Sequence, residues 1–412
     1  KKEILKFLDI EESEVSFYYG QKKDSSGKLV IFVINSAVKN SNLEKSHLES
    51  PFNFMIADEC HHYGANLFSK IFNFSVKYSL GLSATPEREK DKEGTEKIIK
   101  GIGLKVYELN HLDDPKAIPP FVIWSILVDL TEEEKSKYEE NSIKIVKLNN
   151  FFLKKFGISP EEEDYAKKIK KLAEKNNPVA RKLLSLWSKQ ADIKYQAENK
   201  VAPVKELVDM EKHSKIIVFN ERIAFAQKLY EELTKEFNLN LFLIHSNLTK
   251  KEVMETLEKF RNVGKGVLVA PRLIDEGYDV PDASVAIVVS FTRSARQMIQ
   301  RDGRILRKTP EKELATRYSL IIKDIEEEKY FEVLRNAQMS GKALEGAWLE
   351  FNQDNNSFSE SHQFKDDFIN FGEIKKYHKD QFKDWLIKNL DYYELHIQKL
   401  DIKEIEKRLE FF

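Results

Sequence analysis

The sequence is poor in cysteine and has no long apolar run. One cysteine in 412 residues, Cys60, excludes an intramolecular disulfide framework and suits a reducing compartment. No stretch of 18 consecutive apolar residues occurs, so the sequence predicts no membrane-spanning helix. The mixed-charge start "KKEILKFLDI" does not have the pattern of a signal peptide. We therefore expect a cytoplasmic protein with no membrane partner.

The sequence also lacks a surplus of charge of either sign. Lys and Arg together number 67 and Asp and Glu 68, which gives a formal net charge of -1. Net charge thus neither demands nor excludes a nucleic-acid partner, and a phosphate-binding surface has to come from local clusters. The apolar content of 41% is enough for the cores of two or three domains.

A phosphate-binding loop of the form G-x-x-x-x-G-K-[ST] is the third absence. The nearest match is "GQKKDSSGKL" at residues 20–29, whose glycines are seven apart rather than five. Leu29 stands where a Ser or Thr would hold Mg²⁺. This stretch is better explained as a polar loop before a strand.

Short apolar runs alternate with helical patterns in two blocks of the chain. Such runs, bounded by turn residues, are typical of strands buried on both faces of a parallel sheet. The predicted strands are residues 28–35, 52–58, 78–85 and 119–130 in the first block, and 215–220, 240–245, 266–271, 285–290 and 317–323 in the second. Helical patterns such as "ERIAFAQKLYEEL" and "KKEVMETLEKF" separate the strands of the second block. We therefore predict an α/β fold of the doubly wound type.

Changes in the residue pattern along the chain predict the domain boundaries. Residues 131–202 read as helices, entered through a capping box at Thr131 and Glu134, and we expect an insertion or linker there. Residues 1–130 and 203–325 are then two tandem parallel-sheet domains. Residues 326–412 are acidic and aromatic, and we expect a helical C-terminal extension. Its aromatic residues are more typical of a core than of an interface, with docking of a protein partner as the alternative.

The stretch "MIADECHHYG" places Asp58 and Glu59 directly after a predicted strand. Ligands of open α/β sheets bind beyond the carboxyl ends of the strands. A carboxylate pair there can hold Mg²⁺ and polarise water beside a phosphate. A zinc site is a weaker explanation, because Cys60, His61 and His62 are contiguous and no second cysteine pair follows. A merely solvated strand exit is the third interpretation, and it suits an isolated Asp-Glu pair.

The pair is not isolated, because three more strings follow it in the chain. "GLSATP" at residues 81–86 puts hydroxyl groups at the end of the next strand. "IDEGYDVP" follows at residues 274–281, and "QRDGRILR" at residues 300–307 spaces its arginines around a glycine. Arginines so spaced suit contact with a triphosphate, whereas a solvated basic helix is the alternative for that string alone.

In this order and spacing the strings resemble the motifs of the superfamily 2 helicases and translocases. DECH is similar to motif II, SAT to motif III, "IDEGYDVP" to motif V and "QRDGRILR" to motif VI. "KIIVFN" matches motif IV by position. The wording of "RQMIQRDGRILR" is most similar to the XPB-like and type III restriction Res-subunit branch of DEAD/DEAH-box (DExH) proteins. The resemblance covers roughly residues 1 to 325.

This resemblance implies two RecA-like domains that bind ATP and Mg²⁺ between them and nucleic acid across both. By resemblance, Asp58 coordinates Mg²⁺ and Glu59 activates water. His61, Ser83 and Thr85 couple the nucleotide site to the strand-binding surface. The implied ATP contacts in the second domain are Glu276, Gly277, Asp279, Gln300, Arg304 and Arg307, with the last two arginines acting as arginine fingers. The implied nucleic-acid contacts are Asn35, Ser36, Asn220, His245, Ser246 and Arg272.

The sequence departs from the family at two places. Pro271 and Arg272 stand where many relatives have a Thr or Ser. The P-loop is missing, and "KKEILKFL" resembles the helix just after motif Ia, which lies downstream of that loop. We therefore expect an N-terminal P-loop segment, from the same gene or a separate chain, and an inactive enzyme without it.

The implied function is ATP-dependent movement along, or unwinding of, nucleic acid. The wording of motifs V and VI favours DNA over RNA. One alternative is a non-catalytic nucleic-acid-binding subunit that kept the fold. Another is the motor subunit of a restriction, defence or repair complex. The C-terminal region has no P-D-x(n)-[DE]-x-K nuclease pattern.

Overall fold

The computed structural model divides the chain into two compact units, residues 1–108 and 109–412. It describes residues 2–39, 52–74, 76–83, 86–88, 91–107, 121–162, 164–271, 283–290, 315–327, 329–330 and 344–360. No helix in these ranges combines the length and apolar composition that a membrane crossing needs.

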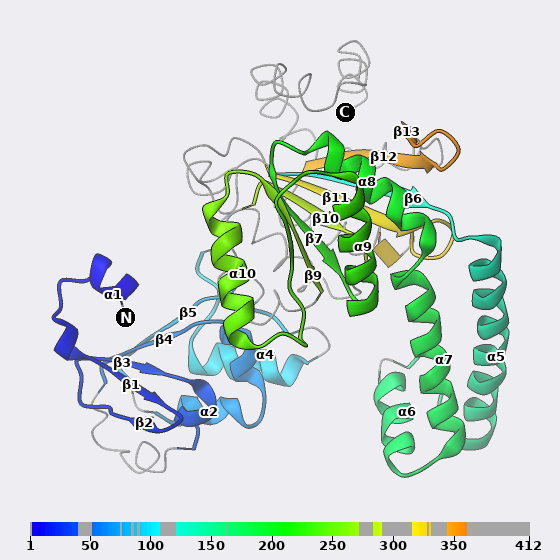
Figure 1. Ribbon diagram of the computed structural model, residues 1–412. Coiled ribbons are helices and arrows are strands. Elements are labelled where there is room, and N and C mark those ends of the chain that lie inside the picture. Colours follow the sequence, from blue (N-terminus) through cyan, green and yellow to red (C-terminus); the bar gives the residue numbers. More distant parts are fainter. Residues whose placement is uncertain are drawn as a thin grey trace, which may run out of the picture. The chain divides into compact units, whose positions relative to one another are not determined.

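Two small sheets form the described part of the first unit (Figure 1). The first has the strand order β2-β1-β3 and the second pairs β4 with β5 in parallel. The strands are β1 (Val15–Tyr19), β2 (Lys22–Lys23), β3 (Leu29–Phe32), β4 (Phe54–Ala57) and β5 (Tyr78–Gly81). The helices are α1 (Lys2–Phe7), η1 (Glu12–Glu14), α2 (Ile34–Ala37), η2 (Cys60–Gly64), η3 (Phe68–Asn73) and α4 (Lys92–Gly101). The loop predicted at residues 20–29 is confirmed except for the two-residue β2 and for Leu29, which begins β3.

The prediction that these strands are buried on both faces is wrong for β4 and β5. Ala57 is fully buried on one face of the pair, where Cys60 and Ile98 pack against it. On the other face Phe54, Ile56 and Tyr78 are 52%, 58% and 59% exposed, and Leu80 is 39% exposed. An apolar run predicts that a strand is buried, but the element that covers each face is decided by the rest of the fold.

An eight-stranded sheet forms the second unit, in the order β13-β12-β6-β11-β10-β7-β9-β8. All neighbours pair in parallel except β12 and β13. The strands are β6 (Phe121–Val128), β7 (Lys215–Asn220), β8 (Leu241–Leu243), β9 (Gly266–Pro271), β10 (Val285–Val288), β11 (Ala315–Ile322), β12 (Leu344–Asn352) and β13 (Ser357–Glu360). The central strands β7, β9, β10 and β11 are almost wholly buried, as the continuous apolar runs of the first three predict. β11 also buries the polar residues Thr316, Arg317 and Ser319.

Helices cover both faces of this sheet (Figure 1). The helices α8 (Val201–Met210) and α9 (Ile223–Glu236) pack on one face, against side chains such as Ile216 and Val218. On the opposite face α10 (Lys250–Asn262) packs against Ile217 and Phe219. The alternation of β7 residues between the two cores confirms the doubly wound arrangement expected for the second block.

Three helices between β6 and η4 (Glu198–Lys200) form an arm with a core of its own. They are α5 (Glu132–Phe156), α6 (Tyr165–Glu174) and α7 (Pro178–Tyr195). In Figure 1 α5 and α7 run side by side and α6 lies at their far end. Phe152, Ile169 and Leu183, one from each helix, are fully buried together.

The boundaries of the arm follow from capping chemistry that the sequence already shows. The predicted capping box is present, because Thr131 Oγ1 accepts the Glu134 amide while the Glu134 carboxylate accepts the Thr131 amide. Helix α5 ends at Gly157, whose φ of 65° is in the left-handed region that glycine tolerates. Asn177 caps α7 ahead of Pro178.

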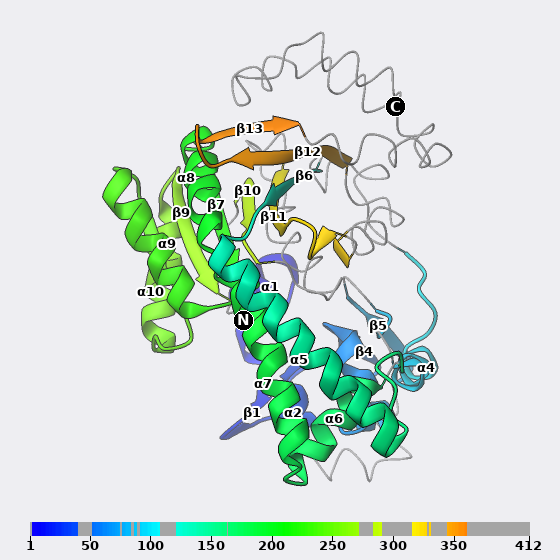
Figure 2. The ribbon, with the colours of Figure 1, turned by 90° about the vertical axis from the view of Figure 1, so that its right-hand side faces the viewer.

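Two sequence predictions about the edges of this sheet are wrong. β6 was expected in the first domain, but it pairs with β11 over residues 121–128 and belongs to the second unit. The extension from residue 326 was expected to be helical, but residues 344–360 form β12 and β13 beside β6 (Figure 2). Both errors have one cause: these pairings join segments about 200 residues apart, and local sequence patterns do not specify which strands become neighbours.

The arm is anchored to the sheet through a buried lysine. Lys200 is fully buried, and its Nζ donates to the carbonyl oxygens of Val289, just after β10, at 2.7 Å and Lys194 at 2.9 Å. Lys194 in turn lies 3.2 Å from the Glu326 carboxylate, which is also buried. Burial lowers the pKa of Lys200 to about 8, although the nearby charge of Glu326 opposes the shift.

This depressed pKa predicts a pH-dependent stability. Between pH 8 and pH 10.5 the unfolded chain binds a proton at Lys200 that the folded chain has lost, so stability rises with pH across this window. We expect the unfolding free energy of the parent, measured relative to Lys200→Met, to rise by about 2.5 kcal/mol from pH 7 to pH 10. Urea unfolding followed by tryptophan fluorescence measures it, because all four tryptophans belong to the second unit.

The control for this experiment is Lys212→Met, which removes a lysine whose side chain is 47% exposed. Its unfolding free energy relative to the parent should show no comparable trend with pH. If the difference in unfolding free energy between the parent and Lys200→Met did not change from pH 7 to pH 10, the depressed pKa of Lys200 would be contradicted.

Candidate active site

The turn after β4 carries the carboxylate pair that the sequence singled out. Asp58 and Glu59 are both exposed, and the Glu59 amide donates to Asp58 Oδ1 at 3.0 Å. Glu59 has φ and ψ of 47°, in the left-handed region that costs a non-glycine residue about 1 kcal/mol or more. The chain therefore turns sharply at Glu59, and the 3-10 helix η2 begins at Cys60.

Backbone hydrogen bonds join this turn to the end of β5. The amide of Leu82 donates to the Ala57 carbonyl and the amide of Cys60 to the Leu82 carbonyl, both at 2.9 Å. The segments after the second and third apolar runs thus lie side by side. This places Ser83 next to the residues of the DECH string.

His61 connects these two segments through its ring. Its side chain is 1% exposed, and Nδ1 lies 2.9 Å from Ser83 Oγ and 3.2 Å from Glu59 Oε2. A proton on Nδ1 can be shared between the hydroxyl and the carboxylate. Nε2 is buried and has no hydrogen-bond partner in the part of the chain that the structure describes. His61 therefore contacts both Glu59 and Ser83.

The metal-cluster interpretation of this stretch finds no support in the geometry. Burial, reinforced by the charges of Glu59 and Asp58, raises the pKa of the Cys60 thiol, which disfavours the thiolate that binds zinc. The ring of His62 lies against that of His61, with centroids 4.1 Å apart. Within the described ranges no three His, Cys, Asp or Glu side chains are grouped to hold a metal ion.

The backbone carbonyl of His61 is held by a further set of contacts, which Arg88 and Asp91 make. Arg88 Nη1 donates to the His61 carbonyl oxygen and Arg88 Nε to Asp91 Oδ2, both at 2.6 Å. Asp91 is the N-cap of α4, where Oδ1 accepts the Gly94 amide at 2.9 Å. Sequence reasoning missed Arg88 and Asp91. A signal was present, since Asp91 precedes the helical pattern "KEGTEKIIKG" as an N-cap residue would.

Five of the six candidate nucleic-acid-contacting residues lie in the described ranges, and Arg272 does not. In the first unit, Asn35 is exposed and Ser36 half-buried in the short helix α2, one turn after β3. In the second unit, Ser246 is exposed and His245 half-buried after β8. Asn220 ends β7 but is fully buried, and its Nδ2 donates to the Arg222 carbonyl at 2.7 Å. Asn220 therefore shapes its turn in this structure and presents no surface to a ligand.

The other candidate residues lie outside the described residues. These are Thr85 in the first unit and Arg272, Glu276, Gly277, Asp279, Gln300, Arg304 and Arg307 in the second. The strands that lead to them, β5, β9 and β10, are described. Because β7, β9 and β10 are parallel neighbours, their carboxyl ends share one edge of the sheet.

Two family models match the chain. The model described as "Type III restriction enzyme, res subunit" matches residues 1–88, and the one described as "Helicase conserved C-terminal domain" matches residues 199–309. The first range contains β1 to β5 and the carboxylate turn. The second begins in η4 and contains β7 to β10 of the eight-stranded sheet.

Curated relatives match over most of the chain. A protein named DNA 3'-5' translocase XPB2, from Sulfurisphaera tokodaii, is 31% identical over 309 residues, which are 75% of this chain and 66% of that protein. One named DNA 3'-5' helicase XPB, from Mycobacterium tuberculosis, is 23% identical over 337 residues, 80% of this chain and 52% of that protein. The chain thus spans less than two thirds of the length of these relatives.

A solved structure shares the fold. It is a fragment described as an HsdR subunit of a type I restriction enzyme from Vibrio vulnificus, 14% identical in sequence, with a TM-score of 0.52. The similarity covers 84% of this chain and 56% of that one.

Proposed function

The chain belongs to the superfamily 2 helicases and translocases, in the XPB-like and type III restriction Res-subunit branch, and we propose that it forms most of an ATP-dependent DNA translocase or helicase. The observation that carries the proposal is the contact of His61 with both Glu59 and Ser83. This contact joins the carboxylate turn to the segment after β5. A motor needs such a connection if ATP hydrolysis is to cause a conformational change outside the nucleotide site. In this proposal the motor acts on DNA.

Each residue of the carboxylate turn has a role in this proposal. Glu59 accepts a proton from the water that attacks the terminal phosphate of ATP, and its side chain is 48% exposed and so reachable. Asp58 brings one exposed carboxylate, which fits Mg²⁺, an ion that takes few protein carboxylates and completes its shell with water and phosphate oxygens. Mg²⁺ bound there would neutralise phosphate charge.

In this proposal the cationic residues that act on ATP belong to the second unit. Arg304 and Arg307 stabilise the charge that develops on the transferred phosphoryl group, and Gln300 contacts the nucleotide. By resemblance to the family, we assign further ATP contacts to Glu276, Gly277 and Asp279. DNA phosphates contact Asn35 and Ser36 in the first unit and His245, Ser246 and Arg272 in the second. Thr85 acts with Ser83 in coupling.

A P-loop segment completes the first unit in this proposal. The chain has no G-x-x-x-x-G-K-[ST] string to cradle the phosphates. The face of the β4–β5 pair that carries Phe54, Ile56 and Tyr78 is apolar and more than half exposed at each of them. Exposed contiguous apolar surface marks a contact site. We propose that this face packs against the element that carries the P-loop, whether that element comes from the same gene or from a separate chain.

ATP hydrolysis by the 412-residue chain, with and without DNA, tests the proposal. We expect little turnover from the chain alone. We expect DNA-stimulated turnover after addition of a segment that bears a P-loop. Turnover by the chain alone would contradict the need for that segment. No turnover even with it would favour a non-catalytic nucleic-acid-binding subunit.

A further inference from the structure

The N-terminal turn of α4 packs against η2 more closely than side chains would permit. A Cβ atom on Gly64, the last residue of η2, would lie 2.4 Å from the Gly94 carbonyl oxygen and 2.5 Å from Arg88 Cδ. Both distances are too short for any real contact. Gly64 therefore lets the backbones of η2 and α4 approach each other. Gly94 has a different effect, because a Cβ there would lie 2.5 Å from Asp91 Oδ2 and 2.6 Å from Arg88 Nε, so its lack of a side chain leaves room for the Arg88–Asp91 pair.

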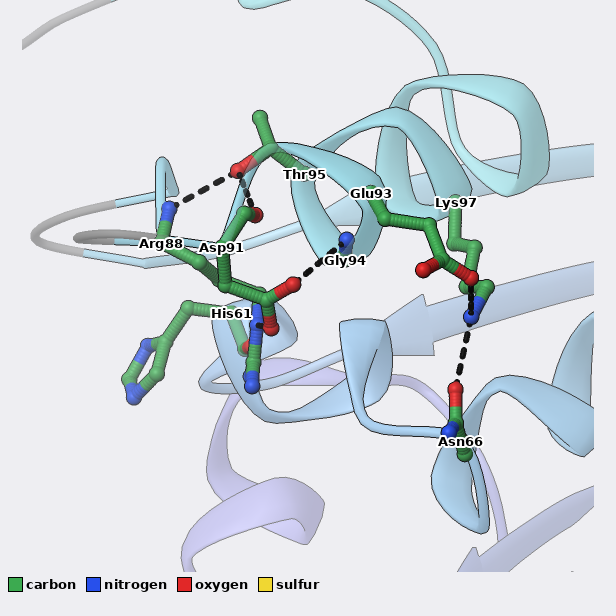
Figure 3. Close-up of polar contacts among 8 residues, drawn as sticks. All are labelled: His61, Asn66, Arg88, Asp91, Glu93, Gly94, Thr95 and Lys97. Atoms are coloured by element: carbon green, nitrogen blue, oxygen red, sulfur yellow. Dashed lines mark hydrogen bonds and ion pairs between the residues drawn. The ribbon is translucent and has the colours of Figure 1, made fainter. Parts of the chain in front are cut away.

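Arg88 is held in this junction by three separate contacts (Figure 3). Its amide donates to Thr95 Oγ1 at 3.0 Å, its Nε to Asp91 Oδ2 and its Nη1 to the His61 carbonyl. Its side chain is only 20% exposed. Asp91 is fixed in its turn, because Oδ1 caps α4 at Gly94. The guanidinium fork thus bridges a helix cap and the backbone of His61, an arrangement that a lysine ammonium would not reproduce.

We propose that Arg88, oriented by Asp91, is a positioning residue that holds the backbone of His61 so that its ring reaches Ser83 and Glu59 together. The bond from Arg88 holds the backbone carbonyl of His61, whereas the contacts with Ser83 and Glu59 are made by its ring. Without this hydrogen bond, the ring would leave the position in which Ser83 Oγ and Glu59 Oε2 both lie within 3.2 Å of Nδ1. For its effect on ATP turnover this inference rests on the proposed function.

A matched control is present on the same helix. Lys97, one turn further along α4, donates to Asn66 Oδ1 at 2.7 Å and lies 2.7 Å from the Glu93 carboxylate. This contact also ties α4 to the segment after η2, but it does not reach His61 (Figure 3). Lys97→Ala therefore removes a comparable tie while it leaves the Arg88 junction in place.

The experiment compares Arg88→Ala, Arg88→Lys and Lys97→Ala in the assembly that hydrolyses ATP. We expect Arg88→Ala to lower kcat about tenfold, with KM for ATP unchanged within about twofold, because positioning is lost and not nucleotide contact. Arg88→Lys should recover part of kcat, and Lys97→Ala should match the parent. In a His61→Ala background, Arg88→Ala should change kcat by less than about twofold, since its effect passes through His61. An undiminished effect in that background, or an equal loss from Lys97→Ala, would overturn the proposal.

A second measurement needs no enzyme activity. In the 412-residue chain with labelled histidines, the ring signals of His61, assigned through His61→Ala, should shift in Arg88→Ala and stay in place in Lys97→Ala. If Arg88→Ala does not fold, Asp91→Asn takes its place, because asparagine keeps the cap but weakens the hold on Arg88. An unmoved His61 signal overturns the inference. If the parent chain shows no ATP turnover even with the P-loop-bearing segment added, the proposed function is overturned and this test remains intact.

Discussion

Replacing Glu59 with glutamine is expected to abolish ATP hydrolysis by the assembled enzyme while ATP binding is kept. The substitution preserves size and hydrogen bonding but removes the carboxylate that accepts the proton of the attacking water. Loss of a general base costs about 10²- to 10⁴-fold in rate. Glu59 is well placed for this role, since it follows Asp58 in the turn directly after β4 and its side chain is about half exposed. Steady-state turnover and nucleotide binding, measured on the same preparation, separate the two effects.

The control for this prediction is Glu93→Gln in the same unit. Glu93 is 79% exposed and pairs only on the surface of α4 with Lys97, so turnover should remain at the parent rate. If Glu59→Gln turned over ATP as fast as the parent, the role of Glu59 would be wrong. If it lost ATP binding as well, Glu59 would have to be reassigned as a nucleotide-binding residue.

Substituting Arg304 with alanine is expected to lower kcat by about 10³-fold or more, the scale measured for arginine fingers. Arg304 belongs to "QRDGRILR", the string that resembles motif VI, and its guanidinium would meet charge that develops only in the transition state. The loss should therefore appear in kcat and in kcat/KM to a similar extent. DNA-stimulated ATP turnover at saturating and limiting ATP measures both.

Arg261→Ala provides the matched control in the second unit. Arg261 lies near the end of α10, where it pairs with Glu258 on the surface, so its loss should leave kcat unchanged. A kcat for Arg304→Ala within a few-fold of the parent would remove Arg304 from the proposed machinery. Arg307→Ala, three residues on, would then be the next variant to measure.

The strands and helices of the second block follow closely from local sequence. β7 and β9 have the predicted bounds, because unbroken apolar runs between turn residues suit strands with both faces covered. The start of α5 was predicted at its capping box and α10 at its helical period. For the active site, the Asp58–Glu59 pair and Ser83 could be placed at strand ends from sequence alone.

The contacts that make these residues a site were not readable from the sequence. Arg88 reaches the His61 carbonyl across 27 positions, and nothing in "SATPER" tells which backbone oxygen it meets. Asn220 was expected at a surface and is fully buried, because its amide turns back to Arg222. β12 pairs with β6 across more than 200 residues, so its helical prediction failed. Long-range pairing reflects packing between distant segments and leaves little local trace.

By itself, the sequence determined the chemistry that the chain carries. The order of the DECH, SAT, "IDEGYDVP" and "QRDGRILR" strings identified the family, and apolar runs and caps determined most of the strands and helices. Only the tertiary structure decided how these parts contact one another. His61 contacts both Glu59 and Ser83, and Arg88, paired with Asp91, binds the His61 carbonyl. Lys200 anchors the helical arm to the sheet. The physical reason is that residue type and spacing act locally, whereas hydrogen bonds between segments exist only once the core has brought those segments together.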